Sequence, residues 1–236
     1  MADTSMPKAA GFNLGKHIVA FLLVGSIGFS TALVFISKPQ DLKDIGGYDI
    51  SLKQPPARDI KAVLKNSLSR GHPIALTDSE INQWLGRTLI TKQGGLLAGM
   101  VTLDRVLVRL EDNRAEVVMV RKIMGRPFTV SMFIKIEQKD TAKGLLTEVQ
   151  LHGGPYCATI PQPPRGGRFG KLVVPQGFLL LVMPAYQRLA TLFHDEIHLA
   201  FEEMVSIKIE KGRLVLSPLE LSADQPKAPA VPPKTS

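Results

Sequence analysis

Hydrophobic residues run without interruption from Ile18 to Ile36, and the run contains no charged residue. A helix rises about 1.5 Å per residue, so this run approaches the roughly 30 Å hydrocarbon core of a bilayer. The pattern predicts a transmembrane helix over residues 18–36, preceded by a tail of residues 1–17. A cleavable signal peptide is the alternative, with cleavage near Ala32. Because the apolar run continues past that site, the sequence favours a retained anchor.

Polar residues then replace the apolar run, and two helices follow. Residues 37–56 carry Pro, Gly and charge without apolar periodicity, which predicts a stalk. Helical spacing returns from Ile60 and stops at Gly71. Thr77 and Glu80 fit a capping box that opens a second helix. The apolar stripe of that helix includes Trp84, the only tryptophan, which is typical of a core position.

Alternating apolar and polar residues next predict a meander of about four antiparallel strands joined by polar turns. Val106, Val108 and Leu110, for example, alternate with residues of the opposite face. Such a meander is typical of a sheet with one covered face. The predicted strands cover residues 106–111, 116–123, 128–137 and 145–151.

For the last third of the fold, the sequence predicts a loop, a helix and a hairpin. Residues 153–171 are dense in Gly and Pro, which predicts irregular structure. A short strand is predicted after them, over residues 171–174. Pro184 begins the longest predicted helix of the domain, whose apolar face reaches Met204. A hairpin of residues 205–209 and 213–216 follows. The Pro-rich tail, residues 222–236, predicts disorder.

Together these patterns predict an α+β domain over residues 57–221. It contains an antiparallel β-meander sheet covered by helices, and one N-terminal transmembrane helix precedes it. Lys residues lie on both sides of the run, so the positive-inside rule is nearly balanced. A short tail before an uncleaved run is the usual signal-anchor layout. We therefore expect a cytoplasmic N-terminus, with the domain outside the cytoplasmic membrane.

The charge and the cysteine content limit the kinds of partner and the covalent links that this chain can have. Beyond residue 36 the chain has 27 basic and 20 acidic residues, a net charge of +7. A basic surface beside a membrane attracts anionic headgroups, at about 1 kcal/mol per well-placed basic residue. Nucleic acid is the other usual partner of a basic protein, but the anchor argues against it. Cys157 stands alone, so no intramolecular disulfide is possible.

A Gly-rich basic segment is the first candidate site. Arg165, Arg168 and Lys171 alternate with glycines, whose amides can point together at an anion such as a lipid headgroup. The segment lacks the strand–turn–helix context of a nucleotide-binding loop. A plain solvated loop is the alternative.

An apolar segment after it is the second candidate. Phe178, Leu179, Leu181 and Val182 form a region that could contact an apolar ligand such as lipid. The alternative is that these side chains belong to the core.

Two histidines are the weak candidates for a metal site. His194 and His198 are four residues apart, so they share one side of a helix. The zinc-protease signature needs Glu directly after the first His, and this chain has Asp195 there. A solvated helix face is the alternative. We find no catalytic triad or carboxylate pair, and we expect no enzyme activity and no cofactor.

The order of these elements resembles the YpmS family of bacterial membrane-anchored proteins. The segment from Thr77 to Asn82 carries the resemblance as a motif, within a similar order of anchor, meander, late helix and hairpin over about residues 18–220. The Arg165–Lys171 segment and the Pro-rich tail depart from it. The resemblance implies an extracytoplasmic α+β domain that handles lipid or assists an envelope assembly, and it supplies no catalytic residues.

We therefore expect a non-enzymatic, single-pass envelope protein that binds lipid or a membrane partner through its extracytoplasmic domain. A scaffold or accessory subunit of a larger membrane complex is the alternative, and a metal-dependent hydrolase using His194 and His198 is a more distant one. Lipid carriage predicts an interior cavity, whereas a scaffold predicts a filled core. The oligomeric state is left open.

Overall fold

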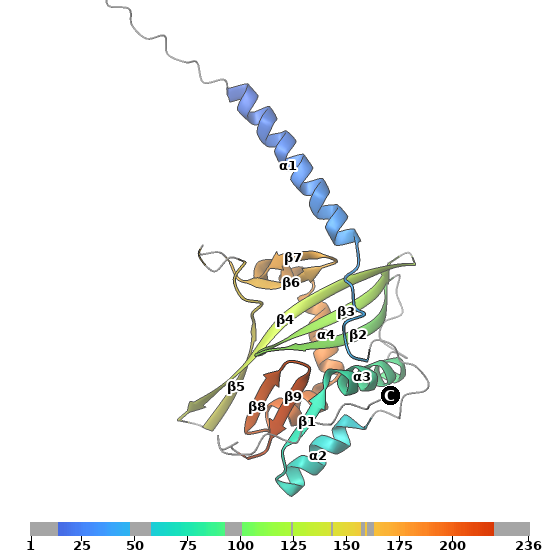
Figure 1. Ribbon diagram of the computed structural model, residues 1–236, viewed down its shortest axis with the longest axis vertical. Helices are drawn as coiled ribbons and strands as arrows, with labels where there is room; N and C mark the ends of the chain where they lie inside the picture. The colour runs from blue at the N-terminus through green and yellow to red at the C-terminus, as the bar shows by residue number, and fades with distance from the viewer. Residues whose placement is uncertain are drawn as a thin grey trace, which may run out of the picture.

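The computed structural model describes residues 14–47, 58–92, 101–123, 125–142, 144–156, 159 and 163–219 (Figure 1). The N-terminal tail up to residue 13 and the predicted stalk after residue 47 lie outside the described residues. Cys157 and the Pro-rich tail, residues 222–236, lie outside them as well.

The described elements group into runs of helices and runs of antiparallel strands, as in an α+β fold. In chain order they are α1 (Leu14–Ser37), α2 (Ile60–Arg70), β1 (Ile74–Thr77), α3 (Asp78–Lys92), β2 (Val101–Glu111), β3 (Arg114–Ile123), β4 (Arg126–Thr141), β5 (Gly144–Leu151), β6 (Arg165–Phe169), β7 (Leu172–Pro175), the 3₁₀ helix η1 (Gln176–Leu181), α4 (Met183–Leu192), α5 (His194–Phe201), β8 (Ser206–Glu210) and β9 (Arg213–Ser217).

Helix α1 stands away from the rest of the molecule (Figure 1). Its span Gly15–Ser37 has a mean hydropathy of 2.3 and none of that window is buried. Among the described residues it is the one helix long and apolar enough to cross a membrane. The prediction of a single membrane-length helix is confirmed to that extent.

The caps of α2 and α3 follow from the sequence. Gly71 ends α2 in the left-handed conformation, at φ 68°. The capping box at α3 is confirmed: the Glu80 amide donates to the Thr77 hydroxyl at 3.2 Å, and the Thr77 amide donates to Glu80 Oε2 at 2.9 Å. Partial burial raises the pKa of the Glu80 carboxyl, but hydrogen bonds from Thr77 and Arg58 outweigh it and lower the pKa below its usual value.

A six-stranded antiparallel sheet forms the centre of the domain, in the order β2-β3-β4-β6-β7 with β5 also paired to β4. The predicted meander is β2 to β5. Because Ile134 pairs with β3 on one side and with β5 on the other, β5 and β6 share one edge of the long strand β4. Strand β5 extends that edge away from the sheet centre (Figure 1).

A three-stranded sheet in the order β1-β9-β8 lies beside the end of β4. The predicted C-terminal hairpin is β8 and β9, and β1, which the sequence did not indicate, adds to its edge. Gln138 on β4 joins the two sheets, since its side chain donates to the Met204 carbonyl and accepts from the Ile207 amide. The small sheet packs with α2 and α5 around Leu64, Met204 and Leu216.

The two faces of the large sheet are covered differently. Its inner face packs on α3, α4 and η1 through a core that includes Leu89, Met119 and Phe193. On its outer face Leu42 and Ile45 pack on Leu107, Val118 and Val120. In Figure 1 the segment after α1 passes in front of β2 and β3, while α4 lies behind the sheet.

The expectation of a stalk over residues 37–56 is therefore corrected for its described part. Leu42 and Ile45 are 6% and 2% exposed, and Gln40 is hydrogen-bonded to β4. Two apolar residues three positions apart are too few to show a period, which is why the sequence pattern missed the packing. We call residues 38–47 the strap.

Two further expectations need correction. Residues 165–169 are a strand, β6, although the segment is rich in glycine. Its glycines are required because a Cβ on Gly167 would lie 1.9 Å from the Ser131 carbonyl oxygen of β4. The predicted long helix after Pro184 is two helices, because Phe193 leaves the helical conformation (φ −113°, ψ 26°) and packs in the core between α4 and α5.

Candidate functional site

A cavity of about 450 Å³ lies between the inner face of the large sheet, helices α2 to α5 and the small sheet. The strand register explains its apolar wall. Val108, Val117 and Met132 lie opposite one another on β2, β3 and β4, and all three line the cavity. Residues directly opposite in adjacent strands share one face of the sheet. The alternation predicted for these strands therefore builds a continuous hydrocarbon surface.

Aromatic side chains form the opposite wall. Trp84 of α3 and Phe193 pack with ring centroids 5.4 Å apart and a tilt of 54°. The Tyr186 hydroxyl of α4 lies 3.0 and 3.1 Å from the carbonyl oxygens of Val117 and Val130, and burial raises its pKa. Because its hydroxyl is held by the sheet backbone, Tyr186 presents its ring to the cavity rather than a free polar group.

The cavity reaches the surface between β5 and the α4–α5 pair. Val149 of β5 and Ala190 and Ile197 of the helices line it and are themselves exposed, Val149 at 55% and Ile197 at 36%. Glu196 of α5 also lines it, as the one charged residue among the described lining residues. Pockets of about 300–1,000 Å³ with mostly apolar walls and few polar groups are typical of small-ligand sites.

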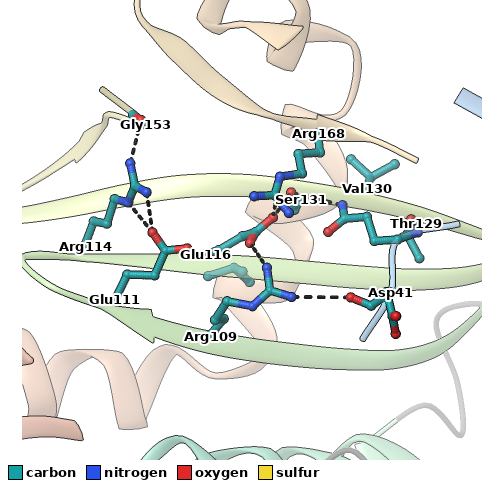
Figure 2. Close-up of polar contacts among 12 residues, drawn as sticks. Asp41, Arg109, Glu111, Arg114, Glu116, Thr129, Val130, Ser131, Gly153 and Arg168 are labelled. Carbon is teal, nitrogen blue, oxygen red and sulfur yellow. Dashed lines mark hydrogen bonds and ion pairs between the residues drawn. The ribbon is translucent and has the colours of Figure 1, made fainter. Parts of the chain in front are cut away.

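A buried polar cluster occupies the outer face of the same sheet (Figure 2). Glu116 of β3 has no exposed surface, yet it accepts from Arg109 Nη1 at 2.5 Å and from Ser131 Oγ at 2.6 Å. Arg168 Nε lies 3.7 Å from the same carboxylate. A buried carboxylate is tolerated when it is paired and hydrogen-bonded, so this cluster has a structural explanation.

The strap closes that cluster. Gln40 donates from its backbone to Thr129 Oγ1 at 2.9 Å and from its side chain to Ser131 Oγ at 3.2 Å. Arg109 also contacts Asp44 at 3.0 Å. The sequence analysis missed this cluster. The predicted alternation placed Arg109 opposite the apolar face, but the pairing of Arg109 with Glu116 is visible only in the strand register.

The three basic residues expected to bind an anion do not converge. Arg165 Nε donates to the Gly154 carbonyl at 3.4 Å, and Arg168 turns toward Glu116 and the Phe133 ring. Lys171 alone is exposed, in the turn between β6 and β7. Headgroup contact by Lys171 stays a prediction.

The expected apolar region divides between surface and core. Phe178 and Leu181 of η1 are 54% and 75% exposed, whereas Leu179 is buried and Val182 packs against the core. None of the four lines the cavity. Its lining comes from strands and helices far apart in the chain, so no local apolar run could reveal it.

His194 and His198 lie side by side on α5, with ring centroids 6.3 Å apart. Both side chains are substantially exposed, at 76% and 44%. His198 Nδ1 lies 2.7 Å from Glu202, and its Nε2 lies 3.3 Å from Glu203. Within the residues that the structure describes, no group of three His, Cys, Asp or Glu residues is placed to hold a metal ion.

No protein-family model matches the chain, and no curated protein matches it. The resemblance to the YpmS family therefore stays a prediction, and the site is argued from its own geometry.

Proposed function

We propose that this protein is a non-enzymatic, membrane-anchored protein that binds a lipid-like apolar ligand in the cavity between its sheet and helices. The observation that carries the proposal is the cavity of about 450 Å³, whose lining residues are aliphatic or aromatic, with Met132, apart from Glu196. A filled core was the expectation for a scaffold subunit, so the cavity favours lipid binding over that alternative.

The free energy of binding comes from the hydrophobic effect. Each methylene group that leaves water for an apolar environment contributes about 0.8 kcal/mol. Apolar cavities of this kind exclude water and accept apolar molecules instead. An alkyl chain that enters between Val149 and Ile197 meets Val108, Val117 and Trp84 without having to break any polar contact.

The membrane supplies the ligand in this proposal. Helix α1 crosses the bilayer as a retained signal anchor, with the N-terminus in the cytoplasm and the domain outside a bacterial cytoplasmic membrane. The apolar surface of α1, none of which is buried, supports the anchoring. The signal-anchor layout supports the orientation.

Trp84 provides a direct test, because it is the only tryptophan and it lines the cavity. We expect a brominated fatty acid, titrated into the full chain held in an amphipathic polymer, to quench its fluorescence, since bromine quenches tryptophan at near-contact range. The unbrominated fatty acid should bind without this quenching and should displace the brominated one.

Two neighbouring residues of α4 give matched variants. Ala190 is exposed and lines the mouth of the cavity, whereas Thr191 is exposed and does not line it. Ala190→Phe should weaken the quenching and Thr191→Phe should leave it unchanged. Absence of saturable quenching in the wild-type chain would reject the proposal and favour the scaffold function, which predicts a co-purifying protein instead.

A further inference from the structure

The turn between β6 and β7 is attached to the end of α1. The Lys171 amide donates to the Phe35 carbonyl at 3.0 Å, and this carbonyl belongs to the last turn of α1, whose acceptors have no partner within the helix. A Cβ on Gly170 would lie 2.3 Å from the Ile36 carbonyl oxygen, so only glycine allows this approach. Its φ of 56° also favours glycine.

Only the four residues of β7, Leu172–Pro175, separate this turn from η1. Strand β7 leads directly from the turn into η1, which packs on both β6 and β7. In a 3₁₀ helix, residues three positions apart lie on the same side, so Phe178 and Leu181 share one face. These two side chains and Leu180 are 54%, 75% and 73% exposed, while Leu179 is buried on the other side.

Three large apolar side chains on one helical turn are an uncommon surface for a domain in water. Each contributes stability when it leaves water, at about 25 cal/mol per Å² of apolar surface. The exposed side chain of Lys171, in the β6–β7 turn that contacts the end of α1, can stay at the headgroup level. Exposed apolar side chains accompanied by a basic residue are the pattern of an element that lies in the membrane interface.

We infer that η1 is an interfacial membrane element, and that Phe178, Leu180 and Leu181 insert into the leaflet from which the C-terminal end of α1 emerges. The inference rests on the membrane anchoring in the proposed function and is independent of the cavity ligand. The β6–β7 hairpin then has a mechanical role, since it joins the membrane helix to a second membrane contact and fixes the tilt of the domain.

Depth-dependent quenching tests this insertion in the full chain. We would replace Trp84 by Phe and introduce one new tryptophan at Leu180, in nanodiscs of phosphatidylcholine. Leu180→Trp should lose fluorescence when the lipid is brominated near the glycerol end of its chains, and less when it is brominated near the chain ends. Its emission should also lie to the blue of a solvent-exposed tryptophan. Leu181→Trp should behave in the same way.

Two further tryptophan variants distinguish a failure of the membrane anchoring from a failure of the inference about η1. Phe29→Trp, in the middle of α1, should be quenched if α1 spans the bilayer, and Leu146→Trp, exposed on β5, should not be quenched. Loss of quenching at Phe29→Trp would reject the membrane anchoring itself. Quenching at Phe29→Trp without quenching at Leu180→Trp and Leu181→Trp would overturn the inference and leave the anchoring intact.

Discussion

The buried carboxylate of Glu116 shows how a single charged residue can belong to a core. Its two oxygens accept from Arg109 and Ser131, and Arg168 lies nearby, so the carboxylate has partners on β2, β4 and β6. Burying two opposite charges is costly, and the pair is retained only when further hydrogen bonds satisfy it. The Gln40 side chain, which donates to Ser131 Oγ, extends this network to the strap.

We predict that Glu116→Gln lowers the free energy of unfolding by about 3 kcal/mol, because the largely buried Arg109 loses its buried partner and keeps only the exposed Asp44. Chemical unfolding of the full chain, followed by Trp84 fluorescence, measures the change. Glu148→Gln is the matched control, because Glu148 forms an exposed pair with Lys139 on the same sheet. Equal effects of the two substitutions would contradict a structural role for the Glu116 cluster.

Part of this residue-level picture could be predicted. Alternation along β2 correctly separated Val108 from Arg109, and the capping box at Thr77 has the predicted hydrogen bonds. The burial of Glu116 could not be predicted, because it depends on the strap, whose contacts with β4 join residues 89 and 91 positions apart.

At the scale of elements, the strap differs most from its sequence pattern. Residues 38–47 contain only two apolar side chains that reach the sheet, so they lack the period of a helix or a strand. Their packing is decided instead by the face they cover, where Leu107, Val118 and Val120 need a partner. The break at Phe193 has the same origin, since tertiary packing overrides the continuous helical period.

We predict that Ile45→Ala releases the strap from the sheet, because Ile45 is 2% exposed and its truncation leaves a cavity. A loss of about 3 kcal/mol in local stability would accelerate trypsin cleavage after Lys43 by about 100-fold. Mass spectrometry of the cleaved full chain in nanodiscs locates the site.

Leu146→Ala serves as the control for the strap experiment, since Leu146 is exposed on β5 and should leave cleavage after Lys43 unchanged. An unchanged cleavage rate in Ile45→Ala as well would mean that residues 38–47 behave as the free stalk that the sequence indicated.

At the scale of the whole molecule, the fold class followed from the sequence but the cavity did not. The meander, the membrane-length helix and the closing hairpin each have a local pattern. The cavity has none, because its wall combines side chains from α2 at one end of the domain sequence to β9 at the other. A void of this kind is set by how well separate elements fit, and periodicity carries no information about fit.

We predict that filling the cavity stabilises the fold and weakens ligand binding. Ala200 of α5 is buried and lines the cavity. Ala200→Leu should raise the free energy of unfolding by about 1 kcal/mol and weaken quenching of Trp84 by the brominated fatty acid. Ala75→Leu, at an exposed position of β1 outside the cavity, should change neither quantity. Strong ligand binding by Ala200→Leu would place the ligand elsewhere.

The strap also has a consequence for how the chain folds. Residues 38–47 follow α1 directly and precede every strand of the sheet in the chain. Gln40 meets its partners Thr129 and Ser131 only about 90 residues later in the chain, and Leu42 and Ile45 meet theirs on β2 and β3. Closing such long loops is slow. Completion of the outer face is therefore expected to be a late and slow step, which follows the pairing of β2, β3 and β4.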